Sequence, residues 1–270
     1  AFYDMGLVED EEPFRNLLTQ GMVNKDGKKM SKSIGNVVSP EEIISKYGAD
    51  TARLFILFAA PPDRELDWSD KGVAGCYRFL NRVYRMVYEI KAKYPDVPQA
   101  FEIKTAADKS LNYSLNYTIK KVSEDVGGRF NFNTAISSLM ELVNEMYKYK
   151  ELDDVNIGLL GKATKDLILM LSPFVPHICE EMWEHIGQKE SVTTMRWPEY
   201  DKDALIKDDV EIVVQINGKV KEKLTVAATA DKQELEKIAL ENEKIKLLLD
   251  GKSVVKVVAV PGRLINIVVK

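Results

Sequence analysis

Residues 21–36 read Gly-Met-Val-Asn-Lys-Asp-Gly-Lys-Lys-Met-Ser-Lys-Ser-Ile-Gly-Asn, and no other stretch says as much about the fold and chemistry of the chain. Three lysines lie within residues 28–32 and glycines lie on both sides, which predicts a mobile cationic loop. The hydroxyls of Ser31 and Ser33 add hydrogen-bond donors and acceptors. Such a loop can close over a polyphosphate and stabilise the charge that develops as a phosphate bond breaks. The alternative interpretation is a solvated hairpin tip with incidental lysines.

The residues that follow the loop predict two short helices. Ser39 is expected to cap the first, with Glu42 completing a capping box, and Gly48 is expected to end it. Asp50 is expected to cap the second, which a proline pair beginning at Pro61 ends. A loop tied to a helix N-terminus in this way has backbone N–H groups and a helix dipole available to an anion.

The composition is that of an ordinary globular protein. A chain of 270 residues is long enough for two or three domains, and 45% apolar with 30% charged residues is typical of soluble proteins. We find no signal peptide and no apolar run of membrane-spanning length, so we expect a cytoplasmic protein without a membrane partner. Neither the pair Cys76 and Cys179 nor the pair His177 and His185 has metal-ligand spacing, so we predict no metal site.

The net charge of −4 does not by itself indicate a nucleic-acid-binding protein, although phosphate binding depends on local patches. Residues 209–270 carry 11 Lys and Arg against 9 Asp and Glu, whereas the remainder carries 27 against 33. The C-terminal part is therefore the mildly basic one.

The hydrophobic pattern predicts a multidomain, mainly α protein. Residues 1–70 have too few apolar partners for a catalytic core, and we expect them to be the end of a larger domain. Residues 71–207 show helical periodicity and predict an α-helical bundle. Tyr77, Tyr84 and Tyr88 follow this periodicity and are predicted to be core residues, not platforms for bases. The bundle helices are expected over residues 77–88, over 108–125, from Asn133, and from about Ala163 through two prolines to Gly187.

Residues 208–270 predict a small ββαββ domain. Apolar residues alternate with polar ones, which indicates strands, and the pair Asn217-Gly218 is a strong hairpin turn signal. The expected elements are strands at 210–216 and 220–226, an amphipathic helix at 231–249, and a second hairpin at 253–269.

Two cationic patterns are candidates for RNA contacts. An arginine set recurs at three or four residues and can share one helix face, either as a solvated face or as a strip that faces phosphates. A lysine set alternates along a strand and is expected on one face of it, either as the wet face of a sheet or as contacts to RNA phosphates. The sets are Arg78, Arg82 and Arg85, and Lys219, Lys221 and Lys223.

Several segments carry a resemblance to a known family. The residues Lys29, Met30, Ser31, Lys32 and Ser33 match the second (KMSKS) signature of class I aminoacyl-tRNA synthetases. The whole chain resembles the C-terminal portion of a bacterial-type leucyl-tRNA synthetase, a class Ia enzyme. The segments that carry this resemblance are residues 61–70, 77–83, 171–177 and 196–198, and residues 213–219, which point to leucine and not to valine or isoleucine.

The resemblance implies an assignment for each part of the chain. Residues 1–70 would be the C-terminal part of a Rossmann-type catalytic domain with the KMSKS loop and a stem-contact region. Residues 71–207 would be an anticodon-binding-type bundle, and residues 208–270 a small tRNA-binding domain that touches the tRNA corner.

The resemblance also implies a reaction. Enzymes of this family join leucine to ATP, giving leucyl-adenylate and pyrophosphate, and then transfer leucine to the terminal ribose of its tRNA. Lys29 and Lys32 would be catalytic by clamping the departing phosphates, and residues 29–33 would bind ATP, with Mg²⁺ accompanying the ATP. The implied partners are leucine, ATP and leucine tRNA, and a monomer is expected.

The chain departs from the family in what it lacks. His185-Ile186-Gly187-Gln188 resembles the first class I signature but lacks its last histidine and follows the lysine loop instead of preceding it. The leucine pocket and editing domain are also missing, so we expect part of a longer enzyme that is inactive alone. The alternatives are a fragment of an isoleucyl or valyl enzyme, and a stand-alone RNA-binding module without catalysis.

Overall fold

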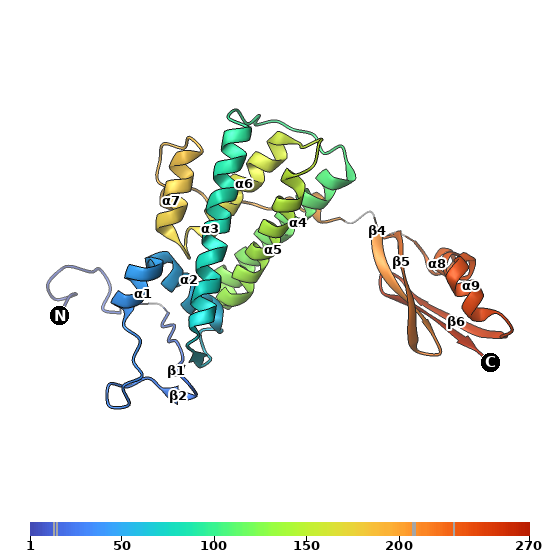
Figure 1. Cartoon of the computed structure of the whole chain (residues 1–270), viewed down its shortest axis with the longest axis horizontal. Helices are drawn as coiled ribbons and strands as arrows, with labels where there is room; N and C mark the ends of the chain where they lie inside the picture. The colour runs from blue at the N-terminus through green and yellow to red at the C-terminus, as the bar shows by residue number, and fades with distance from the viewer. Residues whose placement is uncertain (13, 15, 207–208, 229) are drawn as a thin grey trace. The chain divides into compact units, whose positions relative to one another are not determined.

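The computed structural model describes residues 1–12, 14, 16–206, 209–228 and 230–270. The chain divides into two compact units, residues 1–201 and 202–270 (Figure 1). Each unit has its own hydrophobic core. The domain boundary predicted between residues 207 and 208 lies outside the described residues. The division into three parts therefore stays a prediction.

A small sheet and two helices form the start of the first unit. The sheet has the order β2-β1-β3, with β1 antiparallel to β2 and parallel to β3. Two helices supply the long crossover that parallel strands need. The elements are β1 (Val23–Lys25), β2 (Lys28–Lys29), α1 (Pro40–Tyr47), α2 (Ala49–Ala59) and β3 (Leu66–Asp67).

The starts of α1 and α2 differ from the sequence prediction. Ser39 is the N-cap of α1, but its side chain makes no capping hydrogen bond, so the predicted capping box with Glu42 is wrong. Gly48, with φ +84°, ends α1 and is also the N-cap of α2. Asp50 lies inside the first turn of α2 and does not cap it, because its buried carboxylate binds another helix.

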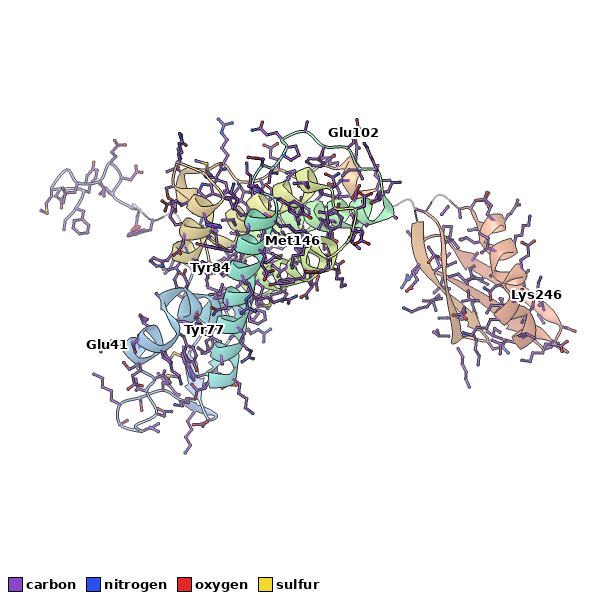
Figure 2. The ribbon with its side chains drawn as sticks, turned by 45° about the horizontal axis from the view of Figure 1, so that its top comes forward. Glu41, Tyr77, Tyr84, Glu102, Met146 and Lys246 are labelled. Atoms are coloured by element: carbon purple, nitrogen blue, oxygen red, sulfur yellow. The ribbon has the colours of Figure 1, made fainter. Side chains whose placement is uncertain are left out.

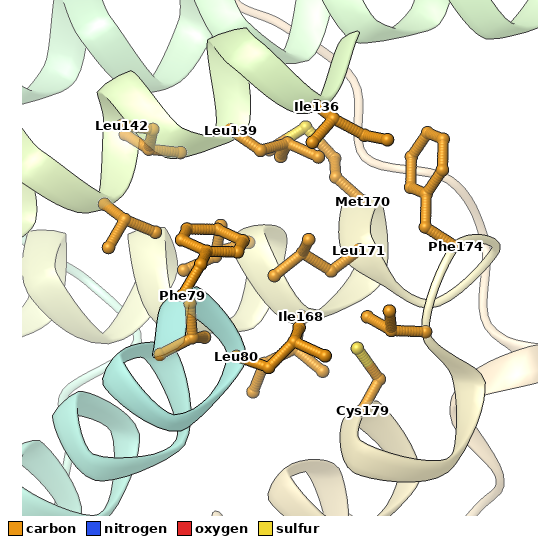
Figure 3. Packing of buried hydrophobic residues seen from close by; sticks show 14 of the residues in the cluster. Phe79, Leu80, Ile136, Leu139, Leu142, Ile168, Met170, Leu171, Phe174 and Cys179 are labelled. Atoms are coloured by element: carbon orange, nitrogen blue, oxygen red, sulfur yellow. The ribbon is translucent and has the colours of Figure 1, made fainter. Parts of the chain in front are cut away.

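The rest of the first unit is a helical bundle, which confirms the mainly α prediction. Apolar stripes at helical spacing meet in one core, where residues of α3, α5, α6 and α7 interdigitate (Figure 3). The helices are α3 (Asp70–Lys93), α4 (Ala106–Glu124), α5 (Phe132–Lys150), α6 (Ile157–Leu171) and α7 (Pro176–His185), with a short 3₁₀ turn at Val192–Thr194. A second 3₁₀ turn, Asp203–Leu205, belongs to the second unit.

Helix α6 begins at Ile157, well before the predicted start at Ala163. The sequence did not predict this start because two glycines lie inside the helix, and glycine usually weakens a helix. Both glycines admit a neighbouring segment. A Cβ on Gly158 would lie 2.7 Å from Phe101 Cβ, and one on Gly161 would lie 2.1 Å from Val97 Cγ1.

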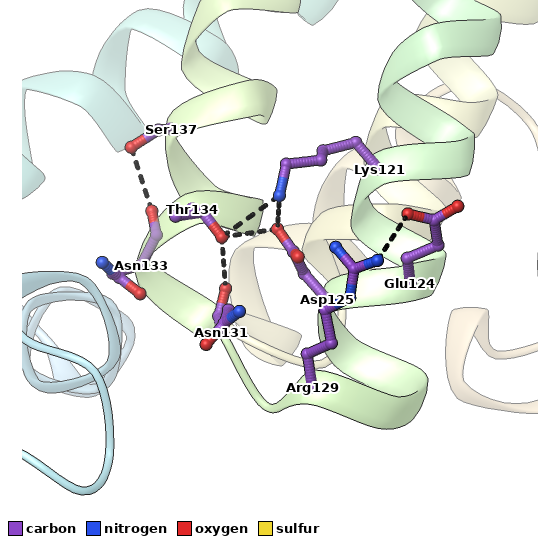
Figure 4. Close-up of polar contacts among 8 residues, drawn as sticks. All are labelled: Lys121, Glu124, Asp125, Arg129, Asn131, Asn133, Thr134 and Ser137. Carbon is purple, nitrogen blue, oxygen red and sulfur yellow. Dashed lines mark hydrogen bonds and ion pairs between the residues drawn. The ribbon is translucent and has the colours of Figure 1, made fainter.

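A π-helical turn, Asp125–Arg129, joins α4 to α5 (Figure 4). The buried Asp125 carboxylate accepts hydrogen bonds from Lys121 Nζ and Thr134 Oγ1. Helix α5 then begins at Phe132, one residue before the predicted cap Asn133. The turn therefore fixes the junction of the two helices through one buried carboxylate.

The second unit is a four-stranded sheet with two helices. The strand order is β5-β4-β7-β6, and the central pair β4 and β7 is parallel. The single helix predicted over 231–249 is broken at Asn242, whose side chain caps the second half by accepting from Ile245 N at 3.2 Å. The elements are β4 (Asp209–Ile216), β5 (Lys219–Ala227), α8 (Lys232–Glu241), α9 (Glu243–Leu249), β6 (Val254–Val260) and β7 (Leu264–Val269).

Candidate functional site

The lysine run begins on a tight β-hairpin. Asn24 pairs with Lys29 and Lys25 with Lys28. The two tip residues, Asp26 and Gly27, have φ values of +54° and +70°, as a type I′ turn requires. The hairpin tip therefore lies before the signature residues 29–33, and the first of them is held on a strand.

Asn36 closes the loop that follows the hairpin. Its Oδ1 accepts a hydrogen bond from Ser31 N at 2.9 Å. Its Nδ2 donates to the carbonyl oxygens of Lys28 and Lys29, at 3.4 and 3.3 Å. One amide side chain thus joins the entry and the return of the loop. Sequence reasoning missed this role, although an Asn directly after a Gly is a turn signal.

Within the loop, Ser31 organises a compact turn. Ser31 Oγ lies 3.1 Å from Ser33 Oγ and accepts from Ile34 N at 3.3 Å. Gly35, with φ +73°, donates its N–H to the carbonyl oxygens of Ser31 and Lys32, both at 3.2 Å. Lys32 and Ser33 are exposed on this turn.

The lysines of the loop carry uncompensated charge. Lys28, Lys29 and Lys32 are exposed, and within the described ranges no Asp or Glu oxygen lies within 4.0 Å of their ammonium groups. The described residues also contain no cluster of three or more His, Cys, Asp or Glu side chains suited to a metal ion. The arrangement is thus chemically suited to an anion rich in oxygen acceptors, such as a polyphosphate.

The base of the hairpin is fixed to the segment that leads into α3. Gly21 N donates to Pro62 O at 2.8 Å, and Trp68 N donates to Asn24 O at 2.7 Å. A Cβ on Gly21 would lie 2.1 Å from the carbonyl oxygen of Arg64, so only glycine fits there. The lysine loop therefore stands on a base that packs against the bundle.

Helix α2 links this region to the start of α7. Asp50 Oδ1 lies 2.8 Å from His177 Nδ1, and Asp50 Oδ2 accepts from Ile178 N at 2.7 Å. The Arg53 guanidinium donates to the carbonyl oxygens of Phe174 and Pro173, at 3.1 and 3.0 Å. Two charged side chains of α2 thereby fix the turn that precedes α7.

The predicted arginine strip lies on α3, where all three residues are exposed. Arg82 is engaged by α5: its guanidinium donates to Asn144 Oδ1 at 2.6 Å and lies 4.2 Å from the centre of the Tyr147 ring. Arg78 and Arg85 have no ion pair among the described residues. Two of the three arginines are therefore available to a phosphate without breaking a contact of the bundle.

The prediction that Tyr77 is a core residue is wrong, because 42% of it is exposed. Helical periodicity places a residue on a face but does not show whether another element covers that face. Tyr84 and Tyr88 are half-buried and pack against the bundle.

The prediction that Lys219, Lys221 and Lys223 share one face of β5 is also wrong. Lys219 pairs with Ile216, whose side chain faces the core, whereas Lys223 pairs with Val213, whose side chain lies on the opposite face of the sheet. The register shifts between Val214 and Gln215, which leaves Lys221 unpaired in a β-bulge. Paired residues share a face, and one extra residue reverses the alternation.

Lys223 is also already paired. Its Nζ lies 2.7 Å from Glu211 Oε1, and this hydrogen bond raises the pKa of the Lys223 ammonium group. On the helix-facing side, Lys244 binds Glu222 and lowers the pKa of that carboxyl group. The lysines of β5 therefore do not form one free cationic stripe.

Two family models match the chain in separate places. Residues 4–69, which contain the lysine loop, match the model for tRNA synthetases class I (I, L, M and V). Residues 108–238 match the anticodon-binding domain of tRNA ligase. The second match extends from α4 in the first unit to α8 in the second.

Solved structures give the same picture. A leucyl-tRNA synthetase of Agrobacterium radiobacter K84, in a ternary complex with tRNA and LeuAMS, aligns with a TM-score of 0.81 and 30% identity, over 100% of this chain and 35% of that one. The chain thus spans about a third of that protein. A methionyl-tRNA synthetase of Mycobacterium tuberculosis, in complex with methionyl-adenylate, aligns with a TM-score of 0.53 over 62% of this chain and 37% of that one; at 19% identity it shows the fold alone.

No helix in the described ranges has both the length and the apolar character needed to cross a membrane. The synthetase model covers the lysine loop, the anticodon-binding model covers most of the bundle, and one synthetase structure aligns over all 270 residues. Residues 4–69 therefore match the class I tRNA synthetases of the isoleucine, leucine, methionine and valine group, and residues 108–238 match the anticodon-binding domain of tRNA ligases.

Proposed function

We propose that this chain is the part of a leucine–tRNA ligase that supplies the ATP-phosphate loop and the tRNA-binding domains. The observation that carries the proposal is the alignment of all of this chain with about a third of a leucyl-tRNA synthetase, combined with the unpaired lysines of a hydrogen-bonded signature loop. The reaction joins leucine to ATP as leucyl-adenylate, releases pyrophosphate, and then transfers leucine to the tRNA.

In this reaction Lys29 and Lys32 act on the phosphates of ATP. Their ammonium groups stabilise the negative charge that grows on the leaving pyrophosphate as the bond to the α-phosphate breaks. Asn36 and Ser31 hold the backbone of the loop, so the lysines are positioned before ATP binds. Mg²⁺ fits this site as a companion of the ATP, since it is commonly bound largely by substrate phosphates and water.

The bundle and the second unit are assigned to tRNA binding. Arg78 and Arg85 are exposed and unpaired in the described part of α3, which suits them to phosphates. The first class I signature is absent from these 270 residues. We therefore expect the chain alone to bind tRNA and not to charge it.

A binding titration tests this proposal. The full chain is titrated with leucine tRNA and with methionine tRNA at several salt concentrations. We expect tighter binding of leucine tRNA and a linear fall of log K with log salt. Equal, weak binding of both tRNAs would remove the leucine assignment. Leucylation of tRNA by this chain alone would refute the proposal that the chain binds tRNA without charging it.

A further inference from the structure

A groove in the first unit is lined by aromatic and polar side chains. Tyr47 lies at the end of α1, Tyr77 and Tyr84 lie on α3 (Figure 2), and His177 and Glu181 lie on α7. The groove holds about 480 Å³ and lies between elements of the same compact unit. This volume is within the usual range of small-ligand sites.

The aromatic rings of the groove are held in place. Tyr77 meets Tyr47 edge to face, with ring centres 5.5 Å apart. Tyr84 stacks on Tyr88 at 4.2 Å, and Tyr88 stacks on His185 at 3.5 Å. A row of stacked rings thus leads up to the groove and ends at Tyr84.

Polar atoms with spare hydrogen-bonding capacity surround these rings. The His177 side chain is 75% exposed and uses only Nδ1 on Asp50, which leaves Nε2 without a partner in the described part of the chain. Asn81, between the two tyrosines of α3, uses its Nδ2 on Tyr77 O at 2.8 Å and keeps Oδ1 for another donor. Glu181 accepts from Tyr84 through Oε1 at 2.9 Å and has Oε2 to spare.

The charges are arranged unevenly. Arg78 and Arg85 directly follow Tyr77 and Tyr84 in the sequence, so each lies about 100° further around α3, beside the groove. Inside the groove the charges are the carboxylates of Asp50 and Glu181. The interior repels a phosphate, whereas its edge attracts one.

We propose that this groove binds an unpaired nucleobase of the tRNA, stacked on Tyr77, with the flanking phosphates on Arg78 and Arg85. Exposed aromatic rings with free polar atoms beside them are how proteins bind unstacked RNA bases. This inference rests on the proposed function, because it names how one part of the tRNA is held.

The first test compares two exposed tyrosines. Tyr77→Leu removes the stacking ring, and Tyr3→Leu removes a matched one near the start of the chain, with 46% exposure against 42%. In the full chain we expect Tyr77→Leu to weaken leucine-tRNA binding about tenfold with an unchanged salt slope. Tyr77→Phe and Tyr3→Leu should keep the affinity, whereas Arg78→Gln should lower the salt slope by about one.

A crosslinking experiment gives an answer that does not depend on any variant. Leucine tRNA that contains 4-thiouridine is irradiated on the unvaried chain, and we expect crosslinks within residues 77–84. If tRNA binds but Tyr77→Leu behaves as Tyr3→Leu does and no crosslink falls in this segment, the groove assignment is overturned while the proposed function stands. If the unvaried chain binds no tRNA, both are overturned.

Discussion

The carboxylate of Asp50 on α2 caps the first turn of α7, with Oδ2 2.7 Å from Ile178 N and Oδ1 2.8 Å from His177 Nδ1. Helix α7 begins at Pro176, which has no N–H, so Ile178 is among its first free donors. Asp50 therefore caps α7 although it lies 128 positions before Ile178 in the sequence. Through this contact the region of the lysine loop is joined to the bundle.

Replacement of Asp50 should destabilise the first unit. Asp50→Ala removes a charged acceptor from a helix N-terminus and leaves the Ile178 N–H without its partner, so we expect a loss of about 2 kcal/mol. Asp153→Ala removes an exposed carboxylate and serves as the control, with a change below about 0.5 kcal/mol. Urea unfolding of the full chain measures both, and an Asp50→Ala value equal to that of the control would contradict the capping role.

The sequence predicted those features that depend on local periodicity. The helical stripes of the bundle and the Asn217-Gly218 turn follow from nearest neighbours in the chain. The capping role of Asp50 was not predictable, because its partner is distant in sequence. The β-bulge at Lys221 was also not predictable, because the alternation of residues along one strand does not reveal its register with the neighbouring strand.

Asn36 should control the order of the lysine loop. Asn36→Ala removes its three hydrogen bonds to Ser31, Lys28 and Lys29. Because proteases cut segments that open locally, we expect trypsin to cleave after Lys28, Lys29 or Lys32 about ten times faster in the variant. Gln233→Ala, which shortens an exposed amide on α8, should leave these cleavage rates unchanged. Equal rates in all three proteins would show that Asn36 does not hold the loop.

Lys32 should contribute directly to polyphosphate binding. Lys32→Ala removes one exposed ammonium group, and a charge-assisted contact of this kind is worth about 1.5 kcal/mol, so the affinity for tripolyphosphate should fall about tenfold. Calorimetric titration of the full chain measures it. Lys232→Ala at the start of α8 removes another exposed lysine far along the sequence and should have no effect. If the two variants bind tripolyphosphate equally well, the phosphate role of Lys32 is lost.

Both cysteines should be inert in the folded protein. Burial raises the pKa of the Cys76 thiol to about 11 and that of Cys179 well above its ordinary value. The thiolate is the reactive species, and a raised pKa means that little thiolate exists at pH 8. We expect no reaction with a disulfide reagent at pH 8 in the native chain and reaction of both thiols after unfolding in urea. Fast labelling of a native thiol at pH 8 would mean that the core around it opens readily.

Two glycines inside bundle helices should respond to alanine in opposite directions. A Cβ on Gly161 of α6 would lie 2.1 Å from Val97 Cγ1. Because a Cβ is fixed to the backbone of α6, Val97 would have to move, so Gly161→Ala should lower the free energy of unfolding by about 1–3 kcal/mol. A Cβ on Gly75 of α3 would meet nothing closer than Arg78 Nη2 at 3.9 Å. Gly75→Ala should therefore gain about 0.5–1 kcal/mol, because alanine loses less conformational entropy in a helix. Urea unfolding midpoints decide between the signs, and a stabilising Gly161→Ala would show that the segment around Val97 does not pack on α6.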